Sequence, residues 1–517
     1  MFSNKPQSCV ECTAGGVGNH ESNGLRRELR IRIQRGKREK HDCRGDNRDS
    51  KHGSDGGRRR KAHASIFAIP HIPEDDDAMT PQESELLVRT GPGTPMGHLI
   101  RQYWIPACLS TELAADAPPL RLLILGEKLV AFRDTSGRVG IMDHRCPHRC
   151  ASLFFGRNGD DGIRCVYHGW KFDVHGNCLE MPNVPRDQDF SHKVKAKAYA
   201  VTERNGLVWV YMGPRKSPPP MPMLEATLLG AEQTAYRVFQ RECNWLQALE
   251  GDIDTSHFGF LHAGAVDPAD LDPTEPNRFV LIDRAPRYHV KDSPWGTTYV
   301  AYRPADEGRT HHRLAHFLFP FWTYPPEGAF GDNIITQAWV PMDDTHTMVY
   351  HITWKVRPVP PRALKGGRSI PGLESKYDYL PNSSDWHGRW RFVANRENDY
   401  LIDREAQATS SYCGITAVSI QDQAITESMG PITDHGLEHL APSDRMIIQT
   451  RRRLAAAARA LSSNGTIPPV VDDPECVLEA RAGSYLADSE LDWIAAYDKQ
   501  LVSAVDPTGK LKRPVAI

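Results

Sequence analysis

Apolar and polar residues alternate over short stretches between residues 101 and 215, a pattern that predicts β-strands. The segment LRLLILGEKLVAFRD holds two apolar runs around a Gly126-Glu127 turn, and AYAVTERNGLVWVYMG holds two around Asn205-Gly206. An Asn-Gly pair favours the tight two-residue turn of a β-hairpin. Pro218, Pro219 and Pro220 then break the pattern, because proline cannot donate to the hydrogen bonds of a sheet. The pattern predicts a compact antiparallel β domain that ends near residue 220.

A larger region with strands and helices follows the prolines. An amphipathic helix is expected first, and five strand-like segments come after it: VLIDRAPRYHV, TTYVAYR, RLAHFLFPFWTYPP, NIITQAWVPM and HTMVYHITWKV. Two helices are predicted towards the C-terminus, over WHGRWRFVANRENDYLIDREAQ and SDRMIIQTRRRLAAAARALSSNG. The second has Ser443 as N-cap and Gly465 just past its end. Strands followed by helices indicate an α+β layer, a twisted antiparallel sheet with helices on one face.

Residues 1–78 differ in composition from the rest. The stretch RRELRIRIQRGKREKHDCRGDNRDSKHGSDGGRRRK is basic, interrupted by glycine and almost free of aromatic residues. Such a segment buries too little apolar surface to fold alone, so we expect a disordered extension, and Met79 resembles a natural start. The predicted organisation is therefore an extension over 1–78, a β domain over 79–220 and an α+β domain over 221–517.

The overall charge and cysteine content narrow the function classes. A formal net charge of -2 gives no general attraction to nucleic acid or to an anionic membrane. The longest apolar runs are too short for a membrane-spanning helix. Eleven cysteines in 517 residues are typical of a reduced compartment rather than of a disulfide framework. We therefore expect a cytoplasmic protein that binds neither nucleic acid nor membrane.

Two cysteines and two histidines form a metal-binding motif in the first domain. Cys146, His148, Cys165 and His168 are spaced C-x-H-x16-C-x2-H. This ligand set suits a [2Fe–2S] cluster in which two cysteines bind one iron and two histidines bind the other. Zinc also binds two cysteines and two histidines. A zinc finger groups its cysteines before its histidines, however, whereas each loop here supplies one of each, which favours the iron–sulfur cluster.

A second polar group lies in NWLQALEGDIDTSHFGFLH. His262 follows His257 by five residues, so a straight α-helix would turn the two rings roughly 140° apart. A widened turn or a helix end between them would let both imidazoles reach one ion. Two histidines and a carboxylate bind non-haem Fe(II) in enzymes that activate O2. The spacing leaves the third ligand open, among these acidic residues: Asp252, Asp254, Asp399, Asp403, Asp422 and Glu427. Asp254, one turn before His257, is better placed to accept a hydrogen bond from an imidazole.

From residue 79 onward the chain resembles the oxygenase (α) component of Rieske non-haem iron aromatic-ring-hydroxylating oxygenases. The resemblance is strongest to the phthalate 4,5-dioxygenase-like branch, which includes O-demethylases of lignin-derived biphenyls. It rests on six segments: RTGPGTPMGHLIRQYWIPA, CPHRCASLFFGRN, CVYHGWKFD, NWLQALEGDIDTSH, NRENDYLIDRE and QDQAITESMGPITDHGLEHL. It implies a Rieske [2Fe–2S] domain followed by a helix-grip catalytic domain.

The resemblance also implies roles for particular residues. The family pattern D-x-x-H-x4-H makes His257 and His262 ligands of a mononuclear iron, and makes Asp254 the carboxylate that links the two metal centres. The pattern D-x4-E makes Asp422 the third ligand, with Asp399 as the alternative. In this family the linked centres belong to neighbouring subunits, which implies a homotrimer or hexamer. His168 of one subunit would then hydrogen-bond Asp254 of the next.

The resemblance further implies chemistry and partners. O2 is the co-substrate, and electrons come from a separate NAD(P)H-dependent reductase that carries flavin and an iron–sulfur centre. Relatives act on aromatic acids, and a carboxylate favours a buried arginine with bidentate geometry. Arg287, Arg303 and Arg313 lie on predicted strands and are candidates for this contact. Hydroxylation of a phthalate-like aromatic acid is the expected activity. O-demethylation of a methoxy-aromatic compound and electron transfer without oxygenase chemistry are the alternatives.

Overall fold

The computed structural model of the chain describes residues 79–273, 278–306, 308–356, 363–373 and 376–514. The extension predicted over 1–78 lies outside the described residues. All described residues fall in one compact unit that covers 73–517. No helix in the described ranges is both long enough and apolar enough to cross a bilayer.

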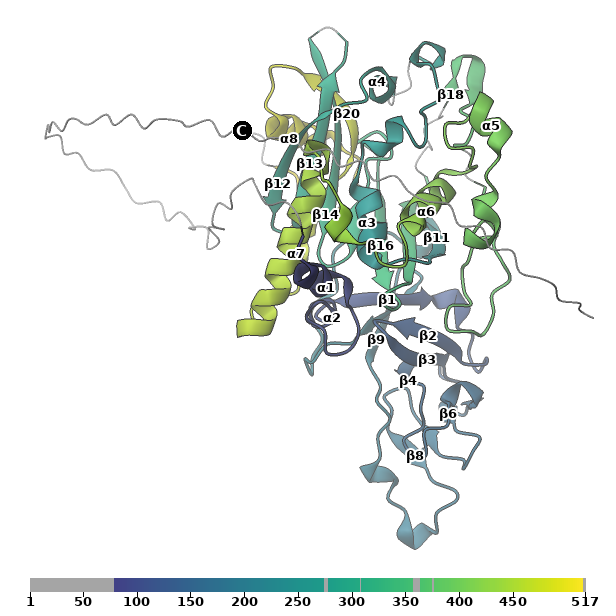
Figure 1. Cartoon of the computed structure of the whole chain (residues 1–517). Helices are drawn as coiled ribbons and strands as arrows, with labels where there is room; N and C mark the ends of the chain where they lie inside the picture. Colours follow the sequence, from purple (N-terminus) through teal and green to yellow (C-terminus); the bar gives the residue numbers. More distant parts are fainter. Residues whose placement is uncertain (1–78, 274–277, 307, 357–362, 374–375, 515–517) are drawn as a thin grey trace, which may run out of the picture. The chain divides into compact units, whose positions relative to one another are not determined.

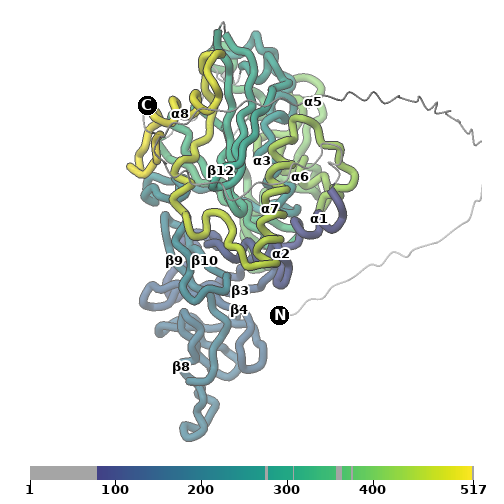
Figure 2. The backbone as a smooth tube through the Cα atoms, turned by 90° about the vertical axis from the view of Figure 1, so that its left-hand side faces the viewer, coloured from purple at the N-terminus to yellow at the C-terminus, as the bar shows by residue number. Residues whose placement is uncertain are grey.

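Two short helices precede the β domain. Thr80 and Thr94 accept hydrogen bonds from the first turns of α1 (Pro81–Val88) and α2 (Pro95–Ile100), and each helix has proline at its start, where a missing N–H costs nothing. Both helices pack against α7 (Arg445–Asn464) near the C-terminus of the chain (Figure 2). The start of the described chain is thereby held on the catalytic domain.

The β domain consists of three small antiparallel sheets. Their strand orders are β1-β10-β9, β2-β3-β4 and β5-β6-β7-β8. The strand bounds are β1 (Trp104–Leu109), β2 (Leu120–Ile124), β3 (Glu127–Arg133), β4 (Val139–Asp143), β5 (Arg157–Gly159), β6 (Gly162–Arg164), β7 (Lys171–Phe172), β8 (Cys178–Glu180), β9 (Ala200–Arg204) and β10 (Leu207–Tyr211).

Both predicted hairpins form in this domain. Asn205 and Gly206 make the turn between β9 and β10 with φ of 56° and 71°, as the Asn-Gly pair predicts. The other turn is one residue earlier than predicted, because Ile124 pairs with Glu127 and leaves Leu125 and Gly126 at the tip. Strand pairing therefore includes Glu127, which the sequence pattern placed in the turn.

The catalytic domain is built on one antiparallel sheet of eight strands. Its order is β11-β17-β16-β15-β14-β13-β12, and β20 pairs with β14 (Figure 1). The bounds are β11 (Thr234–Arg241), β12 (Arg287–Ser293), β13 (Gly296–Pro304), β14 (Arg309–Leu318), β15 (Trp322–Tyr324), β16 (Ile335–Pro341), β17 (Thr347–Trp354) and β20 (Gly483–Asp488), with a separate ribbon of β18 (Ala363–Leu364) and β19 (Arg368–Ser369).

The sequence pattern misplaced two elements in the first part of this region. Strand β11 precedes the first helix, α3 (Trp245–Ile253), although a helix was expected directly after the prolines. The segment VLIDRAPRYHV begins as the short helix α4 (Arg278–Ile282), and only its end belongs to β12. Apolar runs of this length do not distinguish a strand from a buried helical turn.

The helices of the catalytic domain also differ in part from the prediction. Helix α7 ends at Gly465 as expected, but its N-cap is Asp444 rather than Ser443. The helix predicted over residues 386–407 is wrong. The one α-helix that forms there is α5 (Arg404–Thr409), because Asp399, Tyr400 and Leu401 have positive φ, which no right-handed helix accepts. The remaining helices are α6 (Val418–Ser428) and α8 (Trp493–Ser503).

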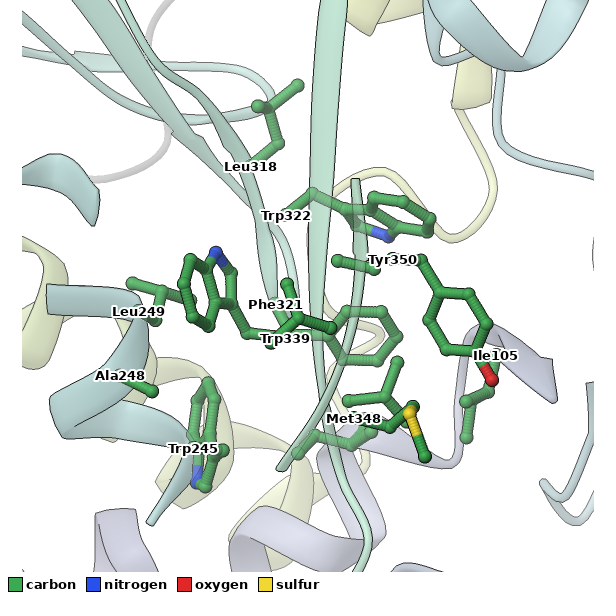
Figure 3. Packing of buried hydrophobic residues seen from close by; sticks show 14 of the residues in the cluster. Ile105, Trp245, Ala248, Leu249, Leu318, Phe321, Trp322, Trp339, Met348 and Tyr350 are labelled. Carbon is green, nitrogen blue, oxygen red and sulfur yellow. The ribbon is translucent and has the colours of Figure 1, made fainter. Parts of the chain in front are cut away.

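One hydrophobic core joins the catalytic sheet to the β domain. Figure 3 shows Trp245 and Leu249 of α3 beside Trp339 of β16, and Ile105 of β1 beside Tyr350 of β17. Burying a side chain of this size contributes about 2 kcal/mol. Because the two domains share this core, they pack as one body, and α3 is fixed in position against the sheet.

Candidate metal centres and active site

The two loops that carry the cysteine–histidine motif have the same backbone hydrogen bonds. The amide of Cys146 donates to the carbonyl of Ala151, and the amide of Cys165 donates to that of Trp170, both at 2.8 Å. In each loop the residue four positions after the cysteine donates back to the cysteine carbonyl. The loops follow β4 and β6, so the β domain presents two matching turns, each with one cysteine and one histidine.

The four side chains of the motif converge. Cys146 and Cys165 are 1% and 3% exposed, and the rings of His148 and His168 lie 4.5 Å apart between centroids. Burial raises the pKa of Cys146 to about 12, and the adjacent Cys165 adds to this effect. Thiolates are therefore unfavourable here unless a cation offsets their charge. Trp170 stacks on His148 at 4.4 Å between ring centroids and covers one side of it. This donor set fits a [2Fe–2S] cluster.

The second candidate centre forms where α3 ends. The helix stops at Ile253, and Asp254 is its C-cap with extended backbone. His257 then begins a 3-10 turn, His257–Gly259, and the chain folds back to bring His262 beside it. The Nε2 atoms of His257 and His262 are 3.0 Å apart. The helix thus ends before His257, not between the two histidines as the spacing suggested, and the convergence follows from the turn.

Asp422 of α6 is the carboxylate that the structure brings to this pair. Its Oδ1 lies 3.1 Å from His262 Nε2 and 3.7 Å from His257 Nε2. Donor atoms on one face of an octahedron with bonds of about 2.1 Å lie about 3.0 Å apart. Two of the three separations match one face of a metal ion, the one between His257 and Asp422 is wider, and the opposite face stays open. Two histidines, one carboxylate and an open face fit non-haem Fe(II).

The other acidic candidates lie elsewhere. Asp399 is exposed, Asp403 caps the first turn of α5, and Glu427 accepts hydrogen bonds from Tyr400 Oη and the amide of Glu242. None of these three belongs to the group of ligand atoms around His257. Sequence spacing alone could not exclude these residues, because it does not show which side chains of the later segments face the histidines after α3.

Hydrogen bonds orient both imidazoles of the triad. Asp254 Oδ2 accepts from His257 Nδ1 at 3.3 Å, and Gln421 Oε1 accepts from His262 Nδ1 at 2.6 Å, which leaves both Nε2 atoms free to bind a metal. Burial raises the pKa of Asp254, but the hydrogen bonds from His257 and Ser256 outweigh it and hold the pKa at about 2. Gln421 was not among the predicted residues; its place next to Asp422 was the only signal.

A pocket opens beside the triad. Its polar lining includes Asp252, Arg313 and Glu327, and its apolar lining includes Phe258 and Val418. The Arg313 guanidinium lies 4.9 Å from the centre of the Phe258 ring. Asp252 accepts a hydrogen bond from Gln337 Nε2 at 2.7 Å, and burial raises its pKa to about 7. The pocket therefore joins an apolar wall to charged groups of both signs.

The three arginines proposed from sequence lie in different environments. Arg313 is 5% exposed and lines the pocket. Arg303 is 1% exposed, does not line the pocket, and places Nη1 3.4 Å from His311 Nδ1. Its Nε and Nη2 have no hydrogen-bond partner among the described residues. Arg287 is exposed at the start of β12 and away from the pocket. The structure thus brings one of the three arginines to the site.

Comparison with known families agrees with this arrangement. Residues 103–199 match the Rieske [2Fe-2S] domain, and residues 210–500 match the family described as LigXa C-terminal domain like. With both matches in this order, the chain belongs to the Rieske non-haem iron oxygenases. It is an oxidoreductase with a [2Fe–2S] domain and a catalytic domain of the kind that carries mononuclear iron. The second match also excludes the alternative of a Rieske electron-transfer protein, which would need the first domain alone.

Individual relatives are oxygenase subunits. The chain is 48% identical to the 3-chlorobenzoate-3,4-dioxygenase oxygenase subunit of Comamonas testosteroni, over 82% of this chain and 99% of that protein. It is 34% identical to the phthalate 4,5-dioxygenase oxygenase subunit of Pseudomonas putida, over 84% and 98%. It is 30% identical to the 5,5'-dehydrodivanillate O-demethylase oxygenase subunit of Sphingobium sp., over 77% and 84%. Oxygenase subunits work in multicomponent systems, so the electrons come from a separate reductase.

Proposed function

We propose that this chain is the oxygenase subunit of a cytoplasmic system that hydroxylates an aromatic carboxylic acid. The observation that carries the proposal is the pocket that joins the His257, His262 and Asp422 triad to the guanidinium of Arg313. The named substrates of two relatives, 3-chlorobenzoate and phthalate, are aromatic carboxylates and support this class. The domain boundary falls at residue 220, after the three prolines.

Each centre has a distinct set of ligands in this proposal. Cys146, His148, Cys165 and His168 hold the [2Fe–2S] cluster, and the triad holds Fe(II). When bound, the cluster supplies single electrons and the ferrous ion supplies open coordination positions for O2. The remaining chemistry depends on how the protein places its own groups around these positions.

The pocket residues orient the substrate. Arg313 is a buried donor that can bind a carboxylate through two parallel N–H groups. Burial and the nearby positive charge of Arg313 lower the pKa of Arg303, so the two guanidinium groups lie close together. Phe258 and Val418 cover the ring of the substrate and exclude water from it. An aromatic acid held in this way presents one ring edge to the open face of the triad.

The electron path runs between subunits in this proposal. Figure 1 draws β6 and β8 far from α3 and α6, so the cluster loops of one chain do not adjoin its own triad. The Nδ1 atom of His168 is buried and has no partner among the described residues, which suits a nitrogen that faces the cluster and leaves Nε2 to donate to a neighbouring subunit. Asp254 is an ionised acceptor beside His257. A head-to-tail trimer would pair these two groups, and hexamers would stack two such rings.

Exposed apolar side chains support that assembly. Phe155, Val166 and Tyr167, near the cluster loops, are 64%, 57% and 53% exposed. On the catalytic domain, Tyr412 is 52% exposed and contacts Phe260, which follows the turn that begins at His257. In a closed head-to-tail ring, one apolar patch of each chain covers the other patch of the next chain. Analytical ultracentrifugation should give three or six chains per particle.

The substrate class is tested with Arg313→Gln. The enzyme, loaded with iron and supplied with a Rieske reductase and NADH, is assayed with 3-chlorobenzoate, phthalate and neutral methoxybenzene. Loss of a bidentate charged contact should raise KM for the acids about 10–100-fold and leave the neutral ring unaffected, since a hydrogen bond to a charged group contributes about 1.5–3 kcal/mol. Arg287→Gln, on the exposed strand end, is the matched control. Equal effects on acidic and neutral rings would refute the carboxylate contact.

Oxidative O-demethylation is the second candidate. It is favoured by the relative that demethylates 5,5'-dehydrodivanillate, a methoxy-aromatic substrate. Assays with methoxybenzoates separate the two reactions, because demethylation releases formaldehyde and ring hydroxylation does not.

A further inference from the structure

A second cluster of potential metal ligands lies outside the active site. Asp343 and His346 belong to the turn between β16 and β17, and His387 comes from the segment that precedes Phe392. One ligand atom of each lies within 4.8 Å of the others. Asp343 Oδ1 is 3.1 Å from His346 Nδ1, and Asp343 Oδ2 is 2.9 Å from His387 Nε2. The two imidazole rings stack at 3.9 Å between centroids.

We propose that Asp343, His346 and His387 bind a divalent transition-metal ion, with Zn²⁺ the ion that best suits the donors. Two imidazoles and one carboxylate are ligands that zinc accepts, and water can fill the fourth position. The side chains are 26%, 25% and 39% exposed, so an ion can enter from solvent and keep a water ligand. This inference does not rest on the proposed function.

Binding needs only small proton shifts. A neutral imidazole carries one proton, and the nitrogen that faces Asp343 now donates it to the carboxylate. When a metal binds that nitrogen, the proton moves to the other ring nitrogen, so no ring has to become an anion. Thr345 keeps Asp343 in place, since its amide and hydroxyl donate to Oδ1 at 2.8 and 3.0 Å. The carboxylate is thereby held with one oxygen at the edge of each ring.

A third cluster of potential metal ligands is already occupied by the positive charge of an arginine, which disfavours a metal ion there. Glu250, His435 and Glu438 also place ligand atoms close together. The Arg451 guanidinium already pairs with both carboxylates, with contacts of 2.6 to 3.0 Å. A second cation would be repelled there. Asp343, by contrast, contacts the two histidines and, among the described residues, no arginine or lysine within ion-pair distance.

The proposed zinc site lies beside the junction between the two domains. The amides of Leu125 and Gly126, at the tip of the β2–β3 hairpin, donate to the carbonyls of Pro341 and Met342 at 2.9 and 2.8 Å. Trp386, next to His387, meets the ring of His144 at 5.3 Å between centroids. A bound ion would tie together the two catalytic-domain segments that hold the β domain. We therefore expect zinc to raise the thermal stability of this junction.

The experiment measures zinc in the full-length enzyme with both iron centres loaded. Isothermal titration with ZnCl2, followed by desalting and elemental analysis, should give one zinc per chain. His346→Gln and His387→Gln should each weaken binding more than about 100-fold, because loss of a direct ligand exceeds the 10–100-fold cost of losing an outer partner. His98→Gln, an exposed histidine on α2, should bind zinc like the parent chain. The visible spectrum of the cluster confirms that each variant is folded.

The site is refuted if His346→Gln and His387→Gln bind zinc as tightly as the parent chain. It is equally refuted if the zinc is lost in His262→Ala and retained in His387→Gln, since the ion then occupies the triad. The two proposals fail separately. Zinc binding that depends on His387 in a chain without oxygenase activity would overturn only the proposed function, and full turnover without zinc binding would overturn only this site.

Discussion

The cluster loops and the iron triad differ in how far apart in the sequence the residues are that position their metal ligands. Each cluster loop closes on itself, because the amides and carbonyls of Cys146 and Cys165 bond to residues at most five positions away. The triad combines a turn after α3 with Asp422 on α6, and His262 meets Gln421, 159 positions further along the chain. Local loops carry their geometry with them, whereas the triad exists only when two distant helices pack together.

The largest expected effect comes from removing one ligand of each centre. His262→Ala should lose the mononuclear iron and more than about 100-fold in turnover, yet keep the red-brown cluster spectrum. Cys165→Ser should lose the cluster spectrum and retain iron at the triad, because the two centres share no ligand. Iron analysis with visible absorption measures both. Loss of both centres in either variant would show that the centres do not form separately.

Asp254→Asn probes the link between the centres. The asparagine side chain keeps an acceptor for Ser256 but loses the charge that holds His257 and that would receive the hydrogen bond from His168 of the neighbouring subunit. Turnover in the iron-replete variant should fall about 10–100-fold with an unchanged cluster spectrum. Rapid-mixing measurement of cluster reoxidation locates the defect. Normal reoxidation and turnover would eliminate the bridging role.

Gln421→Leu tests whether the hydrogen bond from His262 to Gln421 contributes to iron binding at the triad. Leucine cannot accept from His262 Nδ1, so the imidazole loses its orientation and iron affinity should fall about 10-fold. The cluster should be unaffected. Competition with a calibrated chelator gives the affinity, and Gln407→Leu, at an exposed position on α5, serves as the control. An unchanged affinity would mean that packing by itself orients His262.

Trp170→Leu should have the smallest effect, and only on the cluster. Its indole covers His148 and donates to Asn183 Oδ1 at 2.7 Å. The oxidised cluster with its two thiolates is neutral and the reduced form carries one negative charge, so added water stabilises the reduced form. The midpoint potential should rise, by much less than the roughly 250 mV that is the smallest gap between Rieske and plant-type centres. Spectroelectrochemistry measures it, and a fall in potential would contradict this account.

Sequence patterns predicted the elements best where one local signal decided the structure. Asn205-Gly206 specified its turn, and Gly465 ended α7, because each position needs a left-handed backbone that these residues accept. Residues 386–407 mimic a helix in their apolar spacing, yet Asp399 and Tyr400 have positive φ, and the Tyr400 hydroxyl donates to Glu427 of α6. Local propensity yields to such contacts because its energies are small.

The sequence by itself determined the two domains, the order of the metal motifs and the histidines at each centre. These features depend on period, spacing and turns within short segments. The family pattern pointed to Asp422, whereas spacing alone left six acidic residues open. Only the tertiary structure brought the Asp422 carboxylate to the two histidines, added Gln421, and separated the pocket-lining Arg313 from Arg303 and the exposed Arg287. Those outcomes depend on which faces of distant helices and strands meet. Packing and strand register decide which faces meet, and neither can be read from one segment alone.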